Sequence, residues 1–437
     1  MTSWRTALGV YRSRRMLAIL CMGFSSGLPI LLVFSTLSYW LREAGVSRTE
    51  IGLFVLVGIS YSFKFVWSPI IDRLPLPLLT RRLGRRRSWA LAIQLPLMAA
   101  IFALGSTDPK ANLAATALFA VIVAFLSASQ DIVIDAYRIE LLQPDEQGAG
   151  AAATQWGYRI GTLAGSTGVF DAAQFGGWHF AYTIMAALML VGIVTVLMTR
   201  EPEVPAAALP RAPHGTRRQR IARWASTAIV DPFRDFMGRR AWVAILVLIV
   251  LYKLGEALAG TMSNTLYQEL AFAKDEVGNI GKIVGLVATL SGVAVGGALV
   301  ARQGLFRALL YAGVLQMFGN LLYVALLLAG HNNVMLAVSI FGENFTGGMA
   351  SAAFVAYLSS LCNIAFTATQ YALFSSLAAV PARFLAAPSG WLVDQFNWIP
   401  FFLLATLACL PSLFLLVWLR RRAGIDAPPA PSAMPAE

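Results

Sequence analysis

The chain contains twelve apolar runs that are each long enough to cross a bilayer, and this feature restricts its fold more than any other. A helix needs about 20 apolar residues to span the hydrocarbon core. The first six runs lie near residues 16–40, 50–71, 89–106, 112–138, 149–169 and 180–199, and the second six near 241–266, 277–300, 308–329, 334–358, 371–393 and 400–419. We therefore predict an all-α integral membrane protein with twelve transmembrane helices.

Composition excludes the main soluble classes of protein. Only 13% of the 437 residues are charged, against about 25% in soluble globular domains. The net charge of +12 would favour nucleic acid only if the basic residues formed a patch on a soluble domain, and the sequence contains none. The three histidines and three cysteines are scattered, and no nucleotide-binding motif is present. We therefore expect no metal, no cofactor, no disulfide and no nucleic-acid partner.

The twelve runs divide into two sets of six around one long polar loop. We predict a cytoplasmic tail over 1–15, an N-terminal six-helix bundle over 16–199, a basic linker over 200–240, a C-terminal six-helix bundle over 241–419, and a disordered tail over 420–437. Within the linker, Arg217–Arg240 is expected to form a basic amphipathic helix on an anionic leaflet.

The distribution of basic residues predicts the orientation in the membrane. If the N-terminus is cytoplasmic, 25 of the 34 lysines and arginines lie on the cytoplasmic side and four on the opposite side, with five inside spans. Cytoplasmic loops carry an excess of basic residues in membrane proteins. Both termini are therefore expected in the cytoplasm.

A 6+6 arrangement around a basic loop is typical of secondary transporters, which hold their substrate between two bundles near the midplane. The loop after the second span reads Asp72-Arg73 and then Gly84-Arg85-Arg86-Arg87. It resembles the signature of the major facilitator superfamily, although the interval is longer here. We expect Asp72 and Arg73 to gate the cytoplasmic mouth. The alternative is that these arginines serve only to orient the chain.

Acidic residues inside spans are the candidates for proton coupling. A charge at the centre of a spanning helix costs roughly 2.5–3.5 kcal/mol on insertion scales. Asp131 and Asp135 share one helical face, and Arg138 follows three residues later. Two carboxylates in one apolar stripe cannot both ionise cheaply, so one is expected to bind and release a proton. Glu343 is a third candidate, and a structural network with Arg138 remains the alternative.

Cations deep in the spans favour an anionic or zwitterionic cargo. Lys64, Arg159, Lys253 and Arg383 lie on four different spans. Lys253 and Glu256 are three residues apart and are close enough to neutralise each other, which is an equally open interpretation. The residues that we expect to bind substrate are Lys64, Gln130, Arg159, Lys253, Glu256, Asn344, Gln370, Tyr371 and Arg383.

From about Met16 to Leu419 the sequence resembles the AmpG family of muropeptide permeases. The strings that carry the likeness are Gly27-Leu28-Pro29, Phe63–Pro69, Ser127–Asp135, Asp231–Phe236, Leu251–Gly255, Phe306–Leu309, Glu343-Asn344, Leu361–Asn363 and Thr367–Gln370. The resemblance implies proton-driven import of N-acetylglucosaminyl-1,6-anhydro-N-acetylmuramic acid and its peptides across the bacterial inner membrane. Some members carry two further C-terminal helices, which are not expected here.

Other classes of function stay open. Related facilitators carry other bulky anions such as acetyl-CoA, or assist the assembly of membrane complexes. An intramembrane aspartyl protease would also use two aspartates, but it needs them on different helices, whereas Asp131 and Asp135 lie on one. We therefore expect a monomeric transporter, with muropeptides, protons and membrane lipids as its partners, rather than an enzyme.

Overall fold

The computed structural model describes residues 9–203 and 226–423, and every regular element in these ranges is helical. Ten stretches are long and apolar enough to cross a membrane. One of them, Gln147–Met198, contains two legs that meet at Gly177, where a φ of 76° breaks the helix. Gln147–Met198 therefore accounts for two of the twelve predicted spans, and the 28-residue helix α20 (Asn333–Ser360) accounts for a further one.

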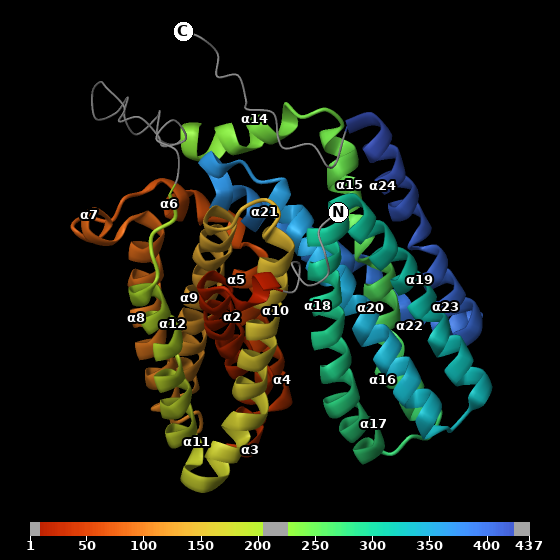
Figure 1. Cartoon of the computed structure of the whole chain (residues 1–437). Helices are drawn as coiled ribbons and strands as arrows, with labels where there is room; N and C mark the ends of the chain where they lie inside the picture. Colours follow the sequence, from red (N-terminus) through yellow and green to blue (C-terminus); the bar gives the residue numbers. More distant parts are fainter. Residues whose placement is uncertain (1–8, 204–225, 424–437) are drawn as a thin grey trace.

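The first six predicted spans form one group of helices, shown in red to yellow-green in Figure 1. Its elements are α2 (Arg14–Val33), α3 (Ser35–Glu43), α4 (Arg48–Leu53), α5 (Ile59–Ser62), α6 (Ser68–Arg73), α7 (Leu79–Leu83), α8 (Arg85–Gly105), α9 (Leu113–Leu141), α10 (Gln147–Leu163), α11 (Val169–Leu188) and α12 (Leu190–Met198). We call this group the N-terminal half.

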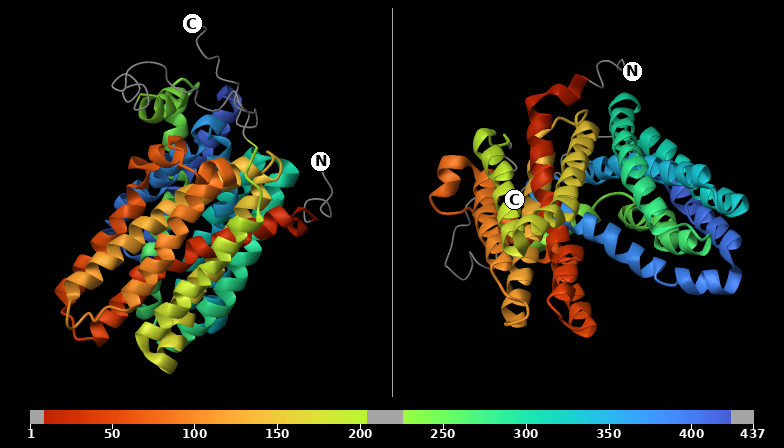
Figure 2. Two further views of the ribbon diagram at one scale, coloured as in Figure 1. Left: turned by 90° about the vertical axis from the view of Figure 1, so that its left-hand side faces the viewer. Right: turned by 90° about the horizontal axis from the view of Figure 1, so that it is seen from below.

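The second group follows the linker and is shown in green to blue. The linker contributes α14 (Asp231–Met237). The second group, which we call the C-terminal half, comprises α15 (Trp242–Tyr252), α16 (Leu254–Glu269), α17 (Lys274–Ile280), α18 (Leu286–Gln303), α19 (Leu305–Ala329), α20, α21 (Thr367–Ala386), α22 (Ser389–Phe396), α23 (Trp398–Leu407) and α24 (Leu410–Ala423). Figure 2 shows the two halves from below, side by side.

The second predicted span is not one continuous helix. Between α5 and α6 the chain makes a short 3₁₀ turn over Lys64–Val66. Pro69 follows at the start of α6, where a missing backbone N–H is tolerated. This break places Lys64 on a turn instead of a regular helix, and its side chain is almost fully buried.

Glycines bring one pair of helices into close contact in each half. In the N-terminal half, a Cβ added to Gly157 or Gly161 of α10 would overlap backbone atoms of α2. In the C-terminal half, a Cβ added to Gly292 or Gly296 of α18 would overlap backbone atoms of α20. Small residues let helix backbones approach closely, so these glycines set the distance between the two helices of each pair.

Segment ends differ slightly from the expected ones. Helix α2 already begins at Arg14, and α24 continues to Ala423, so Arg420, Arg421 and Arg422 belong to a helix. Residues 1–8, 204–225 and 424–437 lie outside the described residues, and so does the first part of the predicted linker helix, 217–225. Of the remainder, the structure describes a π-helical turn over Ser226–Val230 and α14, whose Phe236 packs against Phe374 of α21.

Candidate functional site

Four charged residues gather in the N-terminal half, and we call them the N-terminal cluster: Lys64, Asp131, Asp135 and Arg138. Asp135 is shared by two cations, with Lys64 Nζ at 4.0 Å and Arg138 Nη2 at 3.6 Å. Asp131, one turn earlier on α9, accepts a hydrogen bond of 2.5 Å from the Ser26 hydroxyl of α2. The two aspartates expected on one face therefore have different partners, one ionic and one neutral.

Arg138 connects this cluster to the other half of the molecule. Its Nη1 donates a hydrogen bond of 3.1 Å to Ser359 Oγ of α20. Its guanidinium also lies 5.4 Å from the ring centroid of Tyr371 on α21, within the range of a cation–π interaction. Arg138 is only 1% exposed. The predicted substrate residue Tyr371 thus lies beside the N-terminal cluster, although it belongs to the C-terminal half.

A second group, which we call the C-terminal cluster, contains Lys253, Glu256, Gln316 and Glu343. Lys253 Nζ and Glu256 Oε2 form an ion pair of 2.7 Å, and Gln316 Nε2 donates to the same oxygen at 2.7 Å. Glu256, Gln316 and Glu343 line a small cavity of about 10 Å³. The interpretation that Lys253 and Glu256 neutralise each other therefore agrees with the geometry.

Three predicted substrate residues use their amides for packing. Gln130 donates to the backbone oxygen of Ser25 on α2 at 2.8 Å. Asn344 accepts from Thr289 of α18 at 3.1 Å and donates to its own helix. Gln370 donates to Asp235 of the linker helix α14 at 2.9 Å. These contacts hold helices together, and only the buried Gln130 Oε1 among the three amide groups is left without a partner within the described ranges.

The two remaining predicted cations are exposed. Arg159 lies on α10, and its charge acts on Glu256 of the other half, so it faces the space between the halves. Arg383 lies in the last turn of α21, away from both clusters. Of the predicted binding residues, the structure therefore gathers Lys64 and Tyr371 around one cluster and Lys253, Glu256 and Arg159 around the other.

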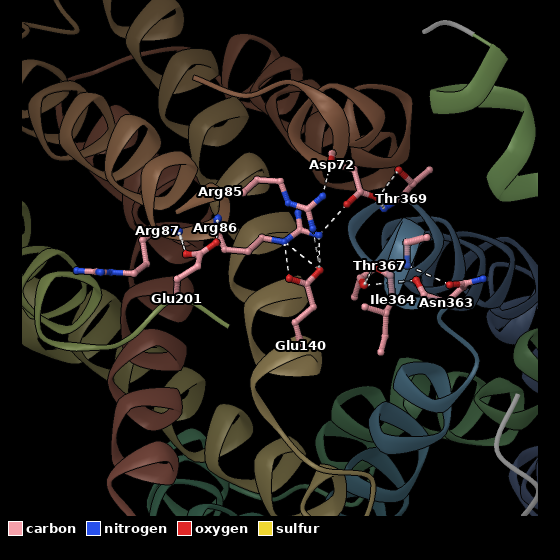
Figure 3. Close-up of polar contacts among 11 residues, drawn as sticks. Asp72, Arg85, Arg86, Arg87, Glu140, Glu201, Asn363, Ile364, Thr367 and Thr369 are labelled. Carbon is pink, nitrogen blue, oxygen red and sulfur yellow. Dashed lines mark hydrogen bonds and ion pairs between the residues drawn. The ribbon is translucent and has the colours of Figure 1, made fainter. Parts of the chain in front are cut away.

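A buried network closes the end of the molecule that carries the loops at 74–84 and 361–366, which we call the basic end. Asp72 Oδ1 pairs with Arg86 Nη2 at 2.7 Å, and Arg86 also pairs with Glu140. Asp72 Oδ2 accepts two hydrogen bonds from Thr369 of α21, from the backbone N–H at 3.1 Å and from the hydroxyl at 3.0 Å. Figure 3 shows this network, and we call Asp72, Arg86, Glu140 and Thr369 the lock.

The electrostatics of the lock keep Asp72 ionised. Burial alone would raise the pKa of the Asp72 carboxyl, but the charges of Arg86 and Arg85 outweigh burial and hold that pKa below its usual value. The second predicted gating residue, Arg73, lies with its guanidinium 4.6 Å from the ring centroid of Phe366, across the interface. Both predicted gating residues thus contact the C-terminal half.

Glu201 anchors the start of the linker beside the lock. Its carboxylate accepts hydrogen bonds from the backbone N–H groups of Arg86 at 2.7 Å and Arg87 at 3.0 Å, at the N-terminus of α8. A Cβ on Gly84 would overlap the Glu201 carboxylate, so the glycine makes room for it. Gly84 also has a φ of 87°, a left-handed backbone conformation that favours glycine. Burial raises the pKa of Glu201 above its usual value.

All hydrogen bonds between the two halves within the described ranges lie toward the basic end. Besides those of Asp72 and Arg138, Gln155 donates to Ser351 at 3.0 Å and Trp156 to the Leu290 carbonyl at 2.8 Å; Tyr11 contributes a further one to Ala294. The protein is therefore closed between its halves at the basic end.

Sequence reasoning missed several residues of these networks. Arg86 was part of the recognised signature, but its partner Glu140 was not considered. Thr369 lies in the string Thr367–Gln370 that carries the family resemblance, but no role was predicted for it. Ser359 gave no sequence signal, because hydroxyls are common in helices. The sequence predicts Arg138 beside Asp135, with a structural network as the alternative, but it does not predict that Arg138 joins the two halves.

The family of this chain is shown by its similarity to known proteins. The Major Facilitator Superfamily model matches residues 16–387. The anhydromuropeptide permease of Escherichia coli K12 is 41% identical over 417 residues, which cover 95% of this chain and 81% of that protein.

Two solved structures share the fold. The proton:xylose symporter XylE, bound to 6-bromo-6-deoxy-D-glucose, superposes with a TM-score of 0.69 at 12% identity, and the match covers 98% of both chains. The human organic anion transporter MFSD10 superposes with a TM-score of 0.62 at 16% identity and covers 95% of this chain and 100% of its own.

Proposed function

This chain belongs to the Major Facilitator Superfamily and, within it, to the family of the anhydromuropeptide permease, and we propose that it imports anhydromuropeptides with protons. It is a multi-pass secondary transporter and not an enzyme. The proposed cargo is N-acetylglucosaminyl-1,6-anhydro-N-acetylmuramic acid with or without its peptide. We propose that the protein acts as a monomer in the bacterial inner membrane, where muropeptides are taken up for cell-wall recycling.

The observation that carries the proposal is the N-terminal cluster. It places two carboxyls and two cations in the membrane, with Arg138 touching the opposite half. Asp131 has only a neutral hydroxyl as its hydrogen-bond partner, so it is the carboxyl best suited to bind and release a proton. Lys64 and Arg138 supply positive charge for the acidic groups of the cargo, and Tyr371 supplies a ring face.

The lock supports alternating access between two bundles. In the state described here the basic end is closed, so the opposite end is the one through which cargo enters. If the basic loops are cytoplasmic, this is an outward-facing state. Cargo and proton binding would then favour a state in which Asp72 and Thr369 separate, since a ligand shifts an equilibrium only by its differential affinity for the two states.

Uptake into proteoliposomes tests the function directly. Purified protein is given radiolabelled disaccharide tripeptide with an inward proton gradient, and acetyl-CoA serves as the alternative bulky anion. We expect accumulation of the muropeptide that collapses when a protonophore is added. Accumulation of acetyl-CoA alone would assign the chain to another cargo, and equal accumulation with and without the gradient would exclude proton coupling.

Spin labels on the basic ends of α9 and α20 test the gating role of the lock. Asp72→Asn removes the charge that holds Arg86 and keeps one oxygen acceptor. We expect the label distances to lengthen toward the inward-facing form and net uptake to slow. An unchanged distance distribution together with normal transport would mean that this loop only orients the chain.

A further inference from the structure

A small, partly open cavity lies within the C-terminal half, apart from the N-terminal cluster. It is lined by Glu256 of α16, Gln316 and Asn320 of α19, and Glu343 and Thr346 of α20, and it measures about 10 Å³. That is room for about one water molecule. Three helices therefore point oxygen-bearing side chains into one small space within the membrane.

The two carboxyls of this cavity each lie over a glycine of the other's helix. A Cβ built on Gly347 of α20 would stand 3.8 Å from Glu256 Oε1, and one built on Gly260 of α16 would stand 3.9 Å from Glu343 Oε1. Each carboxyl therefore lies close to the backbone of the facing helix. Because the arrangement is reciprocal, α16 and α20 bring both carboxyls to the same cavity.

Two amide side chains of α19 also face the cavity. Gln316 and Asn320 are 6% and 3% exposed. Their amide nitrogens have partners, in Glu256 and Cys409, but among the described residues no hydrogen bond reaches either amide oxygen. Buried polar groups are normally satisfied by protein or by ordered water. A water molecule in this cavity would meet both amides and both carboxyls.

The charges identify which carboxyl is ionised. Glu256 has the Lys253 ammonium at 2.7 Å, whereas no salt bridge reaches Glu343 within the described ranges. Two carboxylates that face one cavity in low dielectric cannot both ionise cheaply. In this state Glu343 therefore keeps its proton, and Glu256 stays ionised because Lys253 is beside it.

We propose that Glu256 is a cargo-dependent proton acceptor, which takes up one proton when an acidic group of the cargo draws Lys253 away. This rests on the proposed function and deepens it, since it makes the number of protons depend on the charge of the cargo. The partner chemistry is a carboxylate ligand of the Lys253 ammonium, such as the peptide of a muropeptide.

The proton balance of the step is simple. Before binding, the Lys253 ammonium balances the Glu256 carboxylate, and Glu343 is neutral. After binding, the cargo carboxylate balances Lys253, and a proton from the aqueous phase bonds to an oxygen of Glu256. The net charge of Lys253, Glu256, Glu343 and the bound cargo carboxylate is then zero, as it was for the three residues before binding. Release of the cargo returns Lys253 to Glu256 and expels the proton.

Other charged and titratable groups act on these two carboxyls and belong to the same balance. They are Arg159 of α10, Tyr252 of α15, Cys409, Tyr267 of α16 and Tyr323 of α19. Arg159 is exposed between the halves, so its charge is screened more than that of Lys253. Lys253 is therefore the cation that decides the state of Glu256.

Infrared spectroscopy without any cargo tests the first half of the proposal. In Lys253→Met at neutral pH we expect the band of one additional protonated carboxyl relative to the unmodified protein. That extra band should be absent in the double variant Lys253→Met, Glu256→Gln. The matched control is the double variant Lys253→Met, Glu269→Gln, because Glu269 lies at the exposed end of the same helix. In this control the extra band should remain. An unchanged spectrum in Lys253→Met would overturn the proposal.

Calorimetry in two buffers of different ionisation enthalpy tests the second half, because it counts the protons taken up for each ligand bound. The probes are the disaccharide tripeptide and its analogue with all carboxyls converted to amides. We expect one more proton with the acidic probe, and no difference between the probes in Glu256→Gln. A difference that persists in Glu256→Gln would overturn the proposal.

The two tests separate this inference from the proposed function. If neither probe binds, the cargo is wrong, yet the infrared result still decides whether Lys253 controls Glu256. If uptake is normal and proton-driven but the two probes take up equal numbers of protons, the transport function stands and the role of Glu256 falls.

Discussion

The two charge clusters contain the same kinds of residue, but they are connected in different ways. In the N-terminal cluster, Asp135 is held loosely by two cations at 3.6 and 4.0 Å. In the C-terminal cluster, a single cation lies 2.7 Å from Glu256. The first cluster is bonded across the interface through Arg138, whereas the hydrogen bonds and the ion pair of the second stay within its own half.

This difference indicates a division of labour. A cluster that is bonded to the opposite half changes when the halves separate, so the N-terminal cluster responds to the conformational state. A cluster bonded within one half keeps its geometry until a ligand competes for one of its members, so the C-terminal cluster responds to the cargo. The predictions below test that contrast, beginning with the largest effect.

The largest expected effect is the loss of coupling in Asp131→Asn. Asparagine keeps the hydrogen bond to Ser26 and cannot bind or release a proton at neutral pH. We expect gradient-driven accumulation to fall to the background level while cargo binding and exchange persist, measured by uptake and counterflow in proteoliposomes. Glu343→Gln should retain accumulation, because it mimics the neutral state of that residue.

Exposed Asp171 of α11 supplies the matched control for this experiment, since Asp171→Asn is the same chemical change outside both clusters. Accumulation that survives in Asp131→Asn but is lost in Glu343→Gln would reverse the roles of the two clusters.

The next effect concerns the interface. Arg138→Met removes a hydrogen bond from a charged group, which contributes roughly 1.5–3 kcal/mol, and so should shift the ratio of closed to open basic ends by about tenfold or more. Electron resonance distances between labels on α9 and α20 measure this shift. Lys253→Met should leave the distances unchanged in the absence of cargo, and equal shifts in both variants would remove the contrast.

A smaller effect is expected on affinity. Lys64→Met and Lys253→Met keep much of the apolar stem but remove the charge. We expect each to weaken binding of peptide-bearing cargo by about tenfold, the loss of roughly one charged hydrogen bond, and to change binding of the amide analogue little. Calorimetry measures both. If neither lysine affects the acidic cargo, both are structural members of ion pairs.

The smallest effect is expected from pH at the lock. The pKa of Asp72 is held below its usual value, so the lock contributes stability above the ordinary pKa of an aspartate, about 3.9, and loses it only as pH falls through the lower folded-state value. Label distances at the basic end should therefore be constant between about pH 5 and pH 8 without cargo. An opening within that range would mean that a cluster, and not the lock, holds the basic end closed.

Sequence alone predicted the features that depend on local spacing. The twelve apolar runs fall on helices, and the Lys253–Glu256 pair follows from a separation of three residues on adjoining helical turns. The sequence could not predict the contact of Arg138 with Ser359 or that of Asp72 with Thr369. These contacts join residues that are 221 and 297 positions apart. Helical periodicity carries no information on such partners.

The same limit explains Gln370, which was expected to bind substrate. A buried amide in a spanning helix signals a polar partner, but the sequence does not say whether that partner is a ligand or another helix. Here the partner is Asp235 of the linker helix. Lys64 shows a different limit, since the 3₁₀ turn that carries it interrupts the regular face on which a periodic pattern would place it.

The glycine contact between α2 and α10 has a consequence for the timing of proton release. Gly157 and Gly161 bring the backbones of α10 and α2 into direct contact, and Gln130 hydrogen-bonds α9 to α2. We therefore expect Ser26 and Asp131 to move together as one block during transport. The Ser26 hydroxyl would then stay beside the Asp131 carboxyl, so its movement would not be what releases the proton. Whatever releases the proton must arrive from outside that block, as inflowing water or as charge on the facing half.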